Sequence, residues 1–138
     1  LRPGKPLMHG RLGAMLLLGL PGNPVSSIVC GVLFLVPAIR ALLGDRDAAA
    51  DPTEAALLGT DLPANDTRQD YLRSRFTDRV VALGNASLTL PVVTPHDKQD
   101  SSMLSTLASS DALLVRAPHA PAASAGEPCR IIRLERFC

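Results

Sequence analysis

A short turn between two apolar segments has the residue types needed to hold an anion. In the stretch GLPGNPVSS, residues 19–27, Asn23 precedes a predicted helix and Pro24 is its first residue. Asparagine is a favourable N-cap, and a proline at the first helical position loses no hydrogen bond. The backbone amides of Val25 and Ser26 then lack partners inside the helix, and such amides at a helix start bind anions.

The residues around these amides suit the close approach of a ligand. Gly22 has no side chain to block the backbone, and Pro21 and Pro24 stiffen the turn, so that little entropy is lost on binding. The alternative is a rigid strand-to-helix connection that binds nothing, since the lysine and Ser/Thr of a P-loop are absent. The residues of this turn that we predict to bind a cofactor or substrate are Pro21, Gly22, Asn23, Pro24 and Ser26.

The first residues of the chain add positive charge just before an apolar strand. LRPGKP places Arg2 and Lys5 on either side of a Pro-Gly turn. A lysine ammonium on a stiffened turn can meet an oxyanion as a point charge. The alternative is an ordinary surface lysine with no ligand.

A second pair of cations lies in RQDYLRSRF, residues 68–76. Strand alternation puts Leu72 and Phe76 on one face, which we expect to point at the core. Arg73 and Arg75 then project outward together, and their guanidinium groups suit phosphate or carboxylate. A solvated strand face with scattered salt bridges is the alternative.

The stretch HDKQDSSM, residues 96–103, ends at another predicted helix start. Asp100 or Ser101 would cap this helix, and His96 and Lys98 lie close by in the sequence. Simple capping without a ligand is the alternative to an anion site. We find no Ser/His/Asp arrangement, no paired carboxylates and no set of metal ligands in the sequence.

Composition excludes several classes of protein. A net charge of +1 over 138 residues and an aromatic content of 3% argue against nucleic-acid binding, which needs positive charge and stacking surfaces. The longest apolar run, residues 28–39, is shorter than the roughly 20 residues that cross a bilayer. Three scattered cysteines, of which Cys30 reads as a buried apolar residue, fit a reducing compartment. We therefore expect a cytoplasmic protein without membrane contact.

The first part of the chain predicts half of a βαβ unit. The apolar run 14–20 is typical of a strand covered on both faces in a parallel sheet. A helix follows over residues 24–43, with an interruption at Pro37 and an end at Gly44. Because the chain begins at Leu1 and half a sheet cannot close by itself, we expect a fragment of a longer protein.

Beyond a polar stretch at residues 44–52, the pattern predicts a second, mainly β unit. One helix is predicted within SSMLSTLASS, and the Pro/Ala-rich loop 117–128 is expected to be mobile. The predicted strands are 53–58, 68–76, 79–83, 87–93, 112–116 and 129–134.

Four stretches in this order, RPGKPLMHGRLG, GLPGNPVSS, RQDYLRSR and QDSSMLSTLASSDALLV, resemble the C-terminal part of molybdopterin molybdenumtransferase, the MoeA and gephyrin E-domain family. The resemblance covers essentially the whole of this chain. This chain, however, corresponds to only about the last third of a family member. It implies an α/β plus β fold: residues 1–46 end the molybdopterin-binding α/β domain, 47–51 form a linker, and 52–138 form a β-rich, barrel-like domain.

The resemblance also implies an activity and its residues. The family inserts molybdate into adenylylated molybdopterin and releases AMP, with a divalent cation such as Mg²⁺ whose ligands would lie upstream of Leu1. Lys5, Arg73 and Ser101 match the catalytic lysine, arginine and serine, while Pro21 and Pro24 match the paired prolines beside the pocket. Arg2, which we also expect to bind the substrate, stands where many relatives carry lysine and preserves the charge. A homodimer, and hand-over to the adenylylating enzyme and to molybdoenzymes, are implied as well.

Some positions depart from the family pattern, and other functions stay open. His9 replaces a common aromatic residue, and QDSS stands where QGSH is frequent, so that the contacts around Ser101 differ. One alternative is a non-catalytic scaffold built on the same fold, as in gephyrin. Another is a nucleotide-binding domain of an unrelated family that also handles oxyanions.

Overall fold

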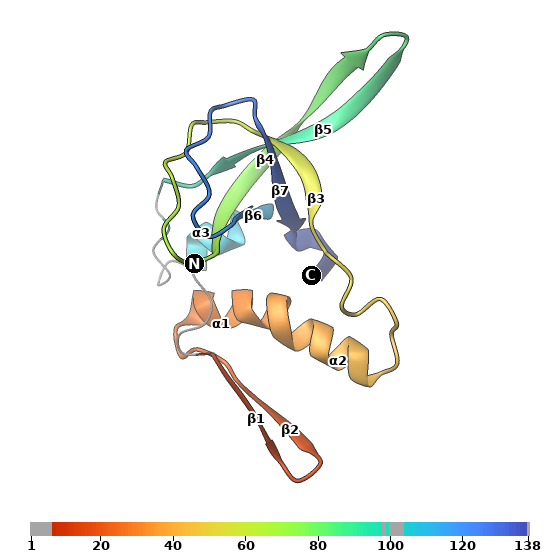
Figure 1. The fold of residues 1–138 in the computed structure, drawn as a ribbon, viewed down its shortest axis with the longest axis vertical. Coiled ribbons are helices and arrows are strands. Elements are labelled where there is room, and N and C mark those ends of the chain that lie inside the picture. Colours follow the sequence, from red (N-terminus) through yellow and green to blue (C-terminus); the bar gives the residue numbers. More distant parts are fainter. Residues whose placement is uncertain (1–6, 98, 100–103, 138) are drawn as a thin grey trace.

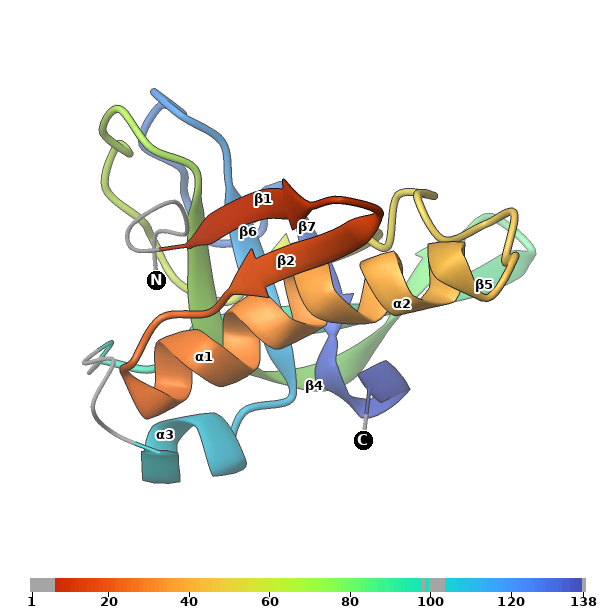
Figure 2. The same ribbon diagram turned by 90° about the horizontal axis from the view of Figure 1, so that it is seen from below.

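The computed structural model of the protein describes residues 7–97, 99 and 104–137. A β-hairpin, a long helix and a closed β-barrel lie one upon the other along the molecule (Figure 1). Seen from below, the hairpin runs along the helix on the side away from the barrel (Figure 2). The molecule is therefore mixed α/β with a β-rich C-terminal part, as predicted.

The first two strands form a hairpin, and this corrects the predicted parallel strand. β1 (Met8–Leu12) pairs antiparallel with β2 (Met15–Gly19), from Met8 opposite Gly19 to Leu12 opposite Met15. Gly13, with φ of 59°, begins the two-residue turn between them, as in type II′ hairpin turns. The strand β1 was not predicted, although this glycine was the signal for it.

The long helix contains the irregularity that Pro37 predicts. It consists of α1 (Pro24–Cys30), a π-helical turn (Gly31–Leu35) and α2 (Val36–Leu42). Pro37 has no N–H to donate to Leu33, so the regular ladder fails just before it, and the N–H of Val36 instead reaches the carbonyl of Gly31. The predicted interruption is confirmed as a π-helical turn.

The end of the helix at Gly44 is also confirmed. Gly44 has a φ of 88°, its N–H donates to the carbonyl of Ala41 at 3.1 Å, and the N–H of Asp45 donates to that of Arg40 at 3.0 Å. These two bonds define a Schellman cap, which favours glycine at the left-handed position. Asp45 also pairs with the Arg40 guanidinium at 2.6 Å across the same helix end.

The long helix carries large apolar side chains on its exposed side as well as on its buried side. Pro24–Leu42 spans 19 residues and is, by length and composition alone, long and apolar enough to cross a membrane, which corrects the estimate from the shorter run 28–39. A core helix of a water-surrounded protein passes the same test. Val25 and Val29 are buried, whereas Ile28, Ile39 and Leu42 are exposed by 47% or more.

Five strands close into a barrel in the order β3-β5-β4-β6-β7, which confirms the predicted barrel-like architecture. β3 and β5 are parallel, and the other neighbours are antiparallel. The strands are β3 (Glu54–Leu58), β4 (Asp70–Leu83), β5 (Ala86–Pro95), β6 (Ala112–Arg116) and β7 (Pro128–Arg133), with α3 (Leu104–Ala108) before β6 and a 3-10 turn (Leu134–Phe137) after β7.

One strand replaces the two that were predicted at 68–76 and 79–83. β4 pairs with β5 without a break from Ser74 opposite Pro95 to Leu83 opposite Ala86. The far part of this ribbon projects beyond the barrel (Figure 1). Both faces of such a ribbon can meet water, so the polar residues 77–79 do not end the strand.

The two faces of the barrel wall have separate apolar clusters. Leu114 packs inside the barrel, whereas its neighbour Leu113 packs outside against Val25 and Val29 of α1, because side chains alternate along a strand. The helix is therefore fastened to the outer face of the barrel. The buried residues of the interior are Ala56, Leu58, Val93, Ala112, Leu114 and Ile131.

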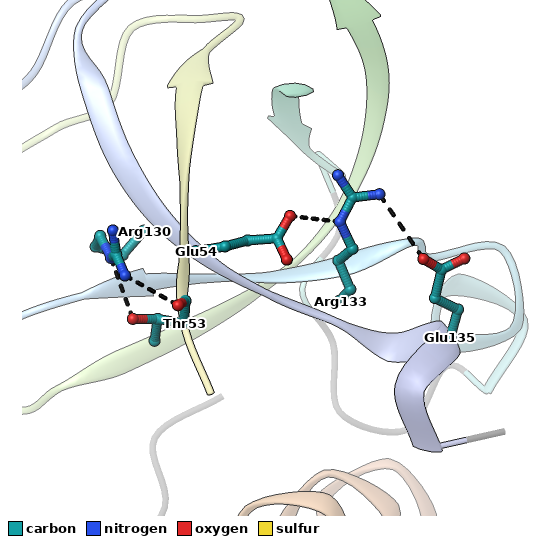
Figure 3. Close-up of polar contacts among 5 residues, drawn as sticks. All are labelled: Thr53, Glu54, Arg130, Arg133 and Glu135. Carbon is teal, nitrogen blue, oxygen red and sulfur yellow. Dashed lines mark hydrogen bonds and ion pairs between the residues drawn. The ribbon is translucent and has the colours of Figure 1, made fainter. Parts of the chain in front are cut away.

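Charged side chains fasten the seam between β3 and β7 (Figure 3). Arg133 forms an ion pair with Glu54 across the seam. The Nη1 atom of Arg133 also lies 3.8 Å from Oε1 of Glu135. Arg130 donates to the carbonyl of Thr53 at 2.9 Å and to its hydroxyl at 3.1 Å. Because Thr53 directly precedes β3 and Glu54 is its first residue, these contacts fix where the chain enters the barrel.

Hydrogen bonds hold the loop at 117–128 in place, which argues against the prediction that this loop is mobile. The Asn65 side chain donates to the carbonyls of Arg116 and Ala117, at 3.2 and 2.9 Å. Arg116 in turn donates to the carbonyls of Pro63 and Pro121, both at 2.9 Å. The loop is thus tied to the chain before β4.

Candidate functional site

Segments from three parts of the sequence meet at the start of the long helix. Leu107 of α3 packs with Val25 and Val29 of α1 in one apolar cluster, and α3 lies beside the beginning of α1 (Figure 2). The N–H of His96 donates to the carbonyl of Arg73 at 3.0 Å. The turn at residues 21–24, Arg73 and the chain after β5 therefore lie at one end of the barrel.

Several of the predicted site residues lie outside the described residues. These are Arg2, Lys5, Lys98, Asp100 and Ser101. Of the other predicted residues, Pro21 is buried, Asn23 and Ser26 are half-buried, and Gly22 and Pro24 are exposed. No atom lies within 4 Å of the place that a side chain would take at Gly22, so the turn is open on that side.

The amides predicted to be open for an anion are capped, which corrects that part of the interpretation. Asn23 Oδ1 accepts the N–H of Val25 at 3.1 Å and that of Ser26 at 3.3 Å. The asparagine was predicted correctly as the N-cap, but a capping oxygen already occupies the direction in which these two amides could hold a ligand. An anion here would have to displace the Asn23 side chain.

Replacing Asn23 with alanine is expected to reveal this competition. Loss of the cap should lower the free energy of unfolding by about 1 kcal/mol, and the released amides should then bind oxyanions more readily. Phosphate should therefore raise the thermal midpoint of Asn23→Ala more than that of the parent protein, with Asn23→Asp as the control that keeps a cap. Equal responses of the two proteins to phosphate would contradict the prediction.

Arg73 is fully buried, contrary to the prediction that it projects outward with Arg75. The alternation was correct, since Leu72 and Phe76 pack on the barrel interior. The opposite face, however, is not open to water here. Arg73 lies opposite Leu113 in the β4–β6 ladder, and cross-strand partners share a face. That is the face that α1 covers.

Arg75 does project outward, and it ties β4 to the end of α3. Its Nε donates to the carbonyl of Ser109 at 3.2 Å, while the side chain remains exposed. The two arginines therefore differ in environment. Arg73 is enclosed in protein, and Arg75 lies at the surface.

His96 lies close to the charges of Arg75 and Arg73, while the carboxylates of Asp111 and Asp97 act on its imidazole in the opposite direction. Burial lowers the pKa of its imidazole, and the charges of Arg75 and then Arg73 lower this pKa further. Its Nε2 is buried without a hydrogen-bond partner in the described part of the chain. The ring is therefore neutral at neutral pH, and the two arginine charges that act on it favour an anion in this region.

Sequence reasoning missed one residue of this region, Gln99. Its side chain bonds to the backbone of Arg73 and of His96. A glutamine after a strand gives no sequence signal of such a role, because its amide can bond to almost any neighbouring group.

The described residues do not fit a magnesium ion. Within residues 7–97, 99 and 104–137, no group of three or more His, Cys, Asp or Glu side chains could hold a metal. Arginine and neutral histidine around the site suit an anion. No step of the chemistry is therefore assigned to a metal held by these residues.

Comparison with known proteins gives consistent matches. The family model for the MoeA C-terminal region (domain IV) matches residues 55–134. The chain is 30% identical, over 98% of its length, to the molybdenum cofactor synthesis protein cinnamon of Drosophila melanogaster. It is 34% identical, over 53% of its length, to the molybdopterin molybdenumtransferase of Haemophilus influenzae.

Solved structures share the fold. The molybdenum cofactor biosynthesis protein of Pyrococcus furiosus matches 94% of this chain with a TM-score of 0.63 and 25% identity, and the match covers 41% of that protein. The molybdopterin biosynthesis moeA protein of Pyrococcus horikoshii matches 94% with a TM-score of 0.61 and 23% identity, over 29% of its own chain. Of the two curated relatives, the chain spans 22% and 18%.

Proposed function

Because the chain belongs to the MoeA family through its C-terminal region, we propose that it acts in molybdenum cofactor biosynthesis as part of a molybdopterin molybdenumtransferase. The whole enzyme would insert molybdate into adenylylated molybdopterin and release AMP. The observation that carries the proposal is the family match over residues 55–134, together with the cationic group that this region brings to one end of the barrel.

The chemistry of the site supports this choice. Molybdate, the phosphates of the adenylylated pterin and the AMP product are all oxyanions. The buried Arg73 guanidinium supplies a charge in a place of low dielectric, where a fixed cation acts more strongly than in water. Arg75 and Lys5 would guide and contact the anion from the surface, and Ser101 would donate a hydrogen bond. Cations held in place in this way need no reorganisation as charge moves during transfer.

The proposal extends to organisation and partners. Residues 1–46 would end the molybdopterin-binding domain, 47–51 would be the linker, and 52–138 the C-terminal domain. The enzyme would be a cytoplasmic homodimer that receives its substrate from the adenylylating enzyme and passes its product to molybdoenzymes. Magnesium would be held by residues outside the described part of this chain. No contact among the described residues favours the scaffold alternative.

The test is maturation of a molybdoenzyme in cells that lack their own insertase. The full-length protein that contains this chain should restore the activity of the molybdoenzyme, and Lys5→Ala should reduce it by about a hundredfold. Arg46→Ala, an exposed cation away from the site, is the matched control and should restore activity fully. Full restoration by Lys5→Ala would contradict the proposed role of the lysine, and failure of the parent protein would contradict the function.

A further inference from the structure

We propose that Gln99 is a positioning residue that clips the backbone of Arg73 to the chain leaving β5. Only the expected effect of Gln99 on molybdenum insertion rests on the proposed function. The hydrogen-bonded clip itself is a property of the fold. Ser101 follows Gln99 by two residues in the sequence. The clip would set where this segment departs from the barrel.

Three hydrogen bonds make the clip. Gln99 Oε1 accepts the N–H of Arg73 at 3.0 Å. Gln99 Nε2 donates to the carbonyl of Arg73 and to the carbonyl of His96, both at 2.9 Å. The orientation of the side-chain amide follows from these partners, because the reversed amide would place its oxygen against two carbonyls.

The side chain takes the place of one link in the β4–β5 ladder. Pro95, the last residue of β5, lies opposite Ser74, and the next link begins normally, with the N–H of His96 donating to the carbonyl of Arg73. A regular antiparallel ladder would return a bond from the N–H of Arg73 to the carbonyl of His96. The amide of Gln99 instead lies between those two groups and bonds to both.

This insertion separates the two strands at a fixed position. The backbone of Arg73 stays satisfied although its partner strand has ended, and the chain after His96 turns back so that residue 99 reaches β4 again. Glutamine has the required length, one acceptor and two donors. Glutamate lacks the donors, asparagine is shorter, and methionine keeps the shape without the bonds.

The same clip acts on the cationic group of the site. Arg73 is completely buried, and the His96 ring lies close enough to the charges of Arg73 and Arg75 for them to lower its pKa. Both Arg73 and His96 are held through their backbones by one side chain. Loss of Gln99 should therefore shift these two groups relative to each other without removing either.

The test uses hydrogen exchange and turnover of the full-length protein. In Gln99→Met, the amide of Arg73 should exchange at least about tenfold faster, because its acceptor is lost while the strand remains. The matched control is Gln69→Met, an exposed glutamine just before the same strand, whose side chain bonds to the Tyr71 hydroxyl at 2.6 Å. Unchanged exchange at Arg73 in Gln99→Met would overturn the clip. If Gln99→Met does not fold, Gln99→Ala, which also lacks the acceptor for the N–H of Arg73, provides the same exchange test.

Turnover distinguishes positioning from a merely structural role. Gln99→Met should lower molybdenum insertion by about tenfold, and the double variant Gln99→Met/Arg73→Lys should be no slower than Arg73→Lys alone. Additive losses would overturn the role in positioning Arg73. If Arg73→Lys itself turns over normally while exchange at residue 73 still rises in Gln99→Met, the clip is upheld and the proposed catalytic role of Arg73 fails. If the parent protein does not insert molybdenum while the exchange result holds, the clip is upheld and the proposed function fails.

Discussion

Replacing Leu113 with alanine is expected to loosen the long helix from the barrel and to cost about 3 kcal/mol of stability. Leu113 is fully buried and packs against Val25 and Val29 on the outer face of the barrel. Removing its side chain leaves a cavity between the helix and the sheet. Amide exchange in α1 should therefore rise more than exchange in the barrel strands.

The neighbouring leucine provides a matched control. Leu114 is equally buried but packs in the barrel interior. Leu114→Ala should lower the free energy of unfolding by a similar amount, and it should raise exchange in the strands more than in α1. Urea unfolding measures the first quantity, and residue-resolved hydrogen exchange measures the second. The same exchange pattern in both variants would contradict the division into two apolar clusters.

The parts of the fold that could be predicted from the sequence depend on local chemistry. Asn23 and Pro24 start a helix wherever the chain allows one, and Gly44 ends it through a left-handed backbone that other residues avoid. Pro37 breaks the ladder because it lacks an N–H. Each signal acts within one or two turns, so no knowledge of distant contacts was needed.

The pairing of the first strands could not be deduced in the same way. An apolar run such as 14–20 has the same pattern in a parallel sheet and in a hairpin with a covered face. The choice depends on the turn at Gly13, which lies one residue before the run. β4 presents a similar problem. Thr77 and Asp78 indicate the end of a strand in the sequence, but polar residues can continue a strand in a ribbon whose two faces are both solvated.

The environment of single side chains in the site also depends on distant parts of the chain that the local sequence does not indicate. Strand alternation correctly placed Arg73 and Arg75 on one face, but it does not tell what covers a face. The helix that covers Arg73 comes from a segment about 45 residues earlier, as the register of Leu113 with Arg73 and its packing against Val29 show. The cap at Asn23 is another case, since the side chain that starts the helix also blocks its amides.

Arg73→Ala is expected to lower the free energy of unfolding about as much as either leucine substitution. Its side chain is fully buried, so truncation leaves a void and should cost about 3 kcal/mol of stability. Arg75→Ala, on the same face but exposed, should change stability by about 0.5 kcal/mol or less. Thermal unfolding of the two variants compares these costs directly, and similar costs would show that Arg73 is not enclosed.

The effect of Arg73 on activity needs a variant that keeps the charge. Arg73→Lys keeps a cation and most of the volume, but it replaces the planar guanidinium, with its five donors, by a point charge. If Arg73 stabilises a developing oxyanion, turnover of the full-length enzyme should fall by about a hundredfold in Arg73→Lys, at a stability close to that of the parent. Loss of stability with unchanged turnover would instead make Arg73 a structural residue. The charge that the anion meets would then have to come from the exposed Arg75 and from Lys5.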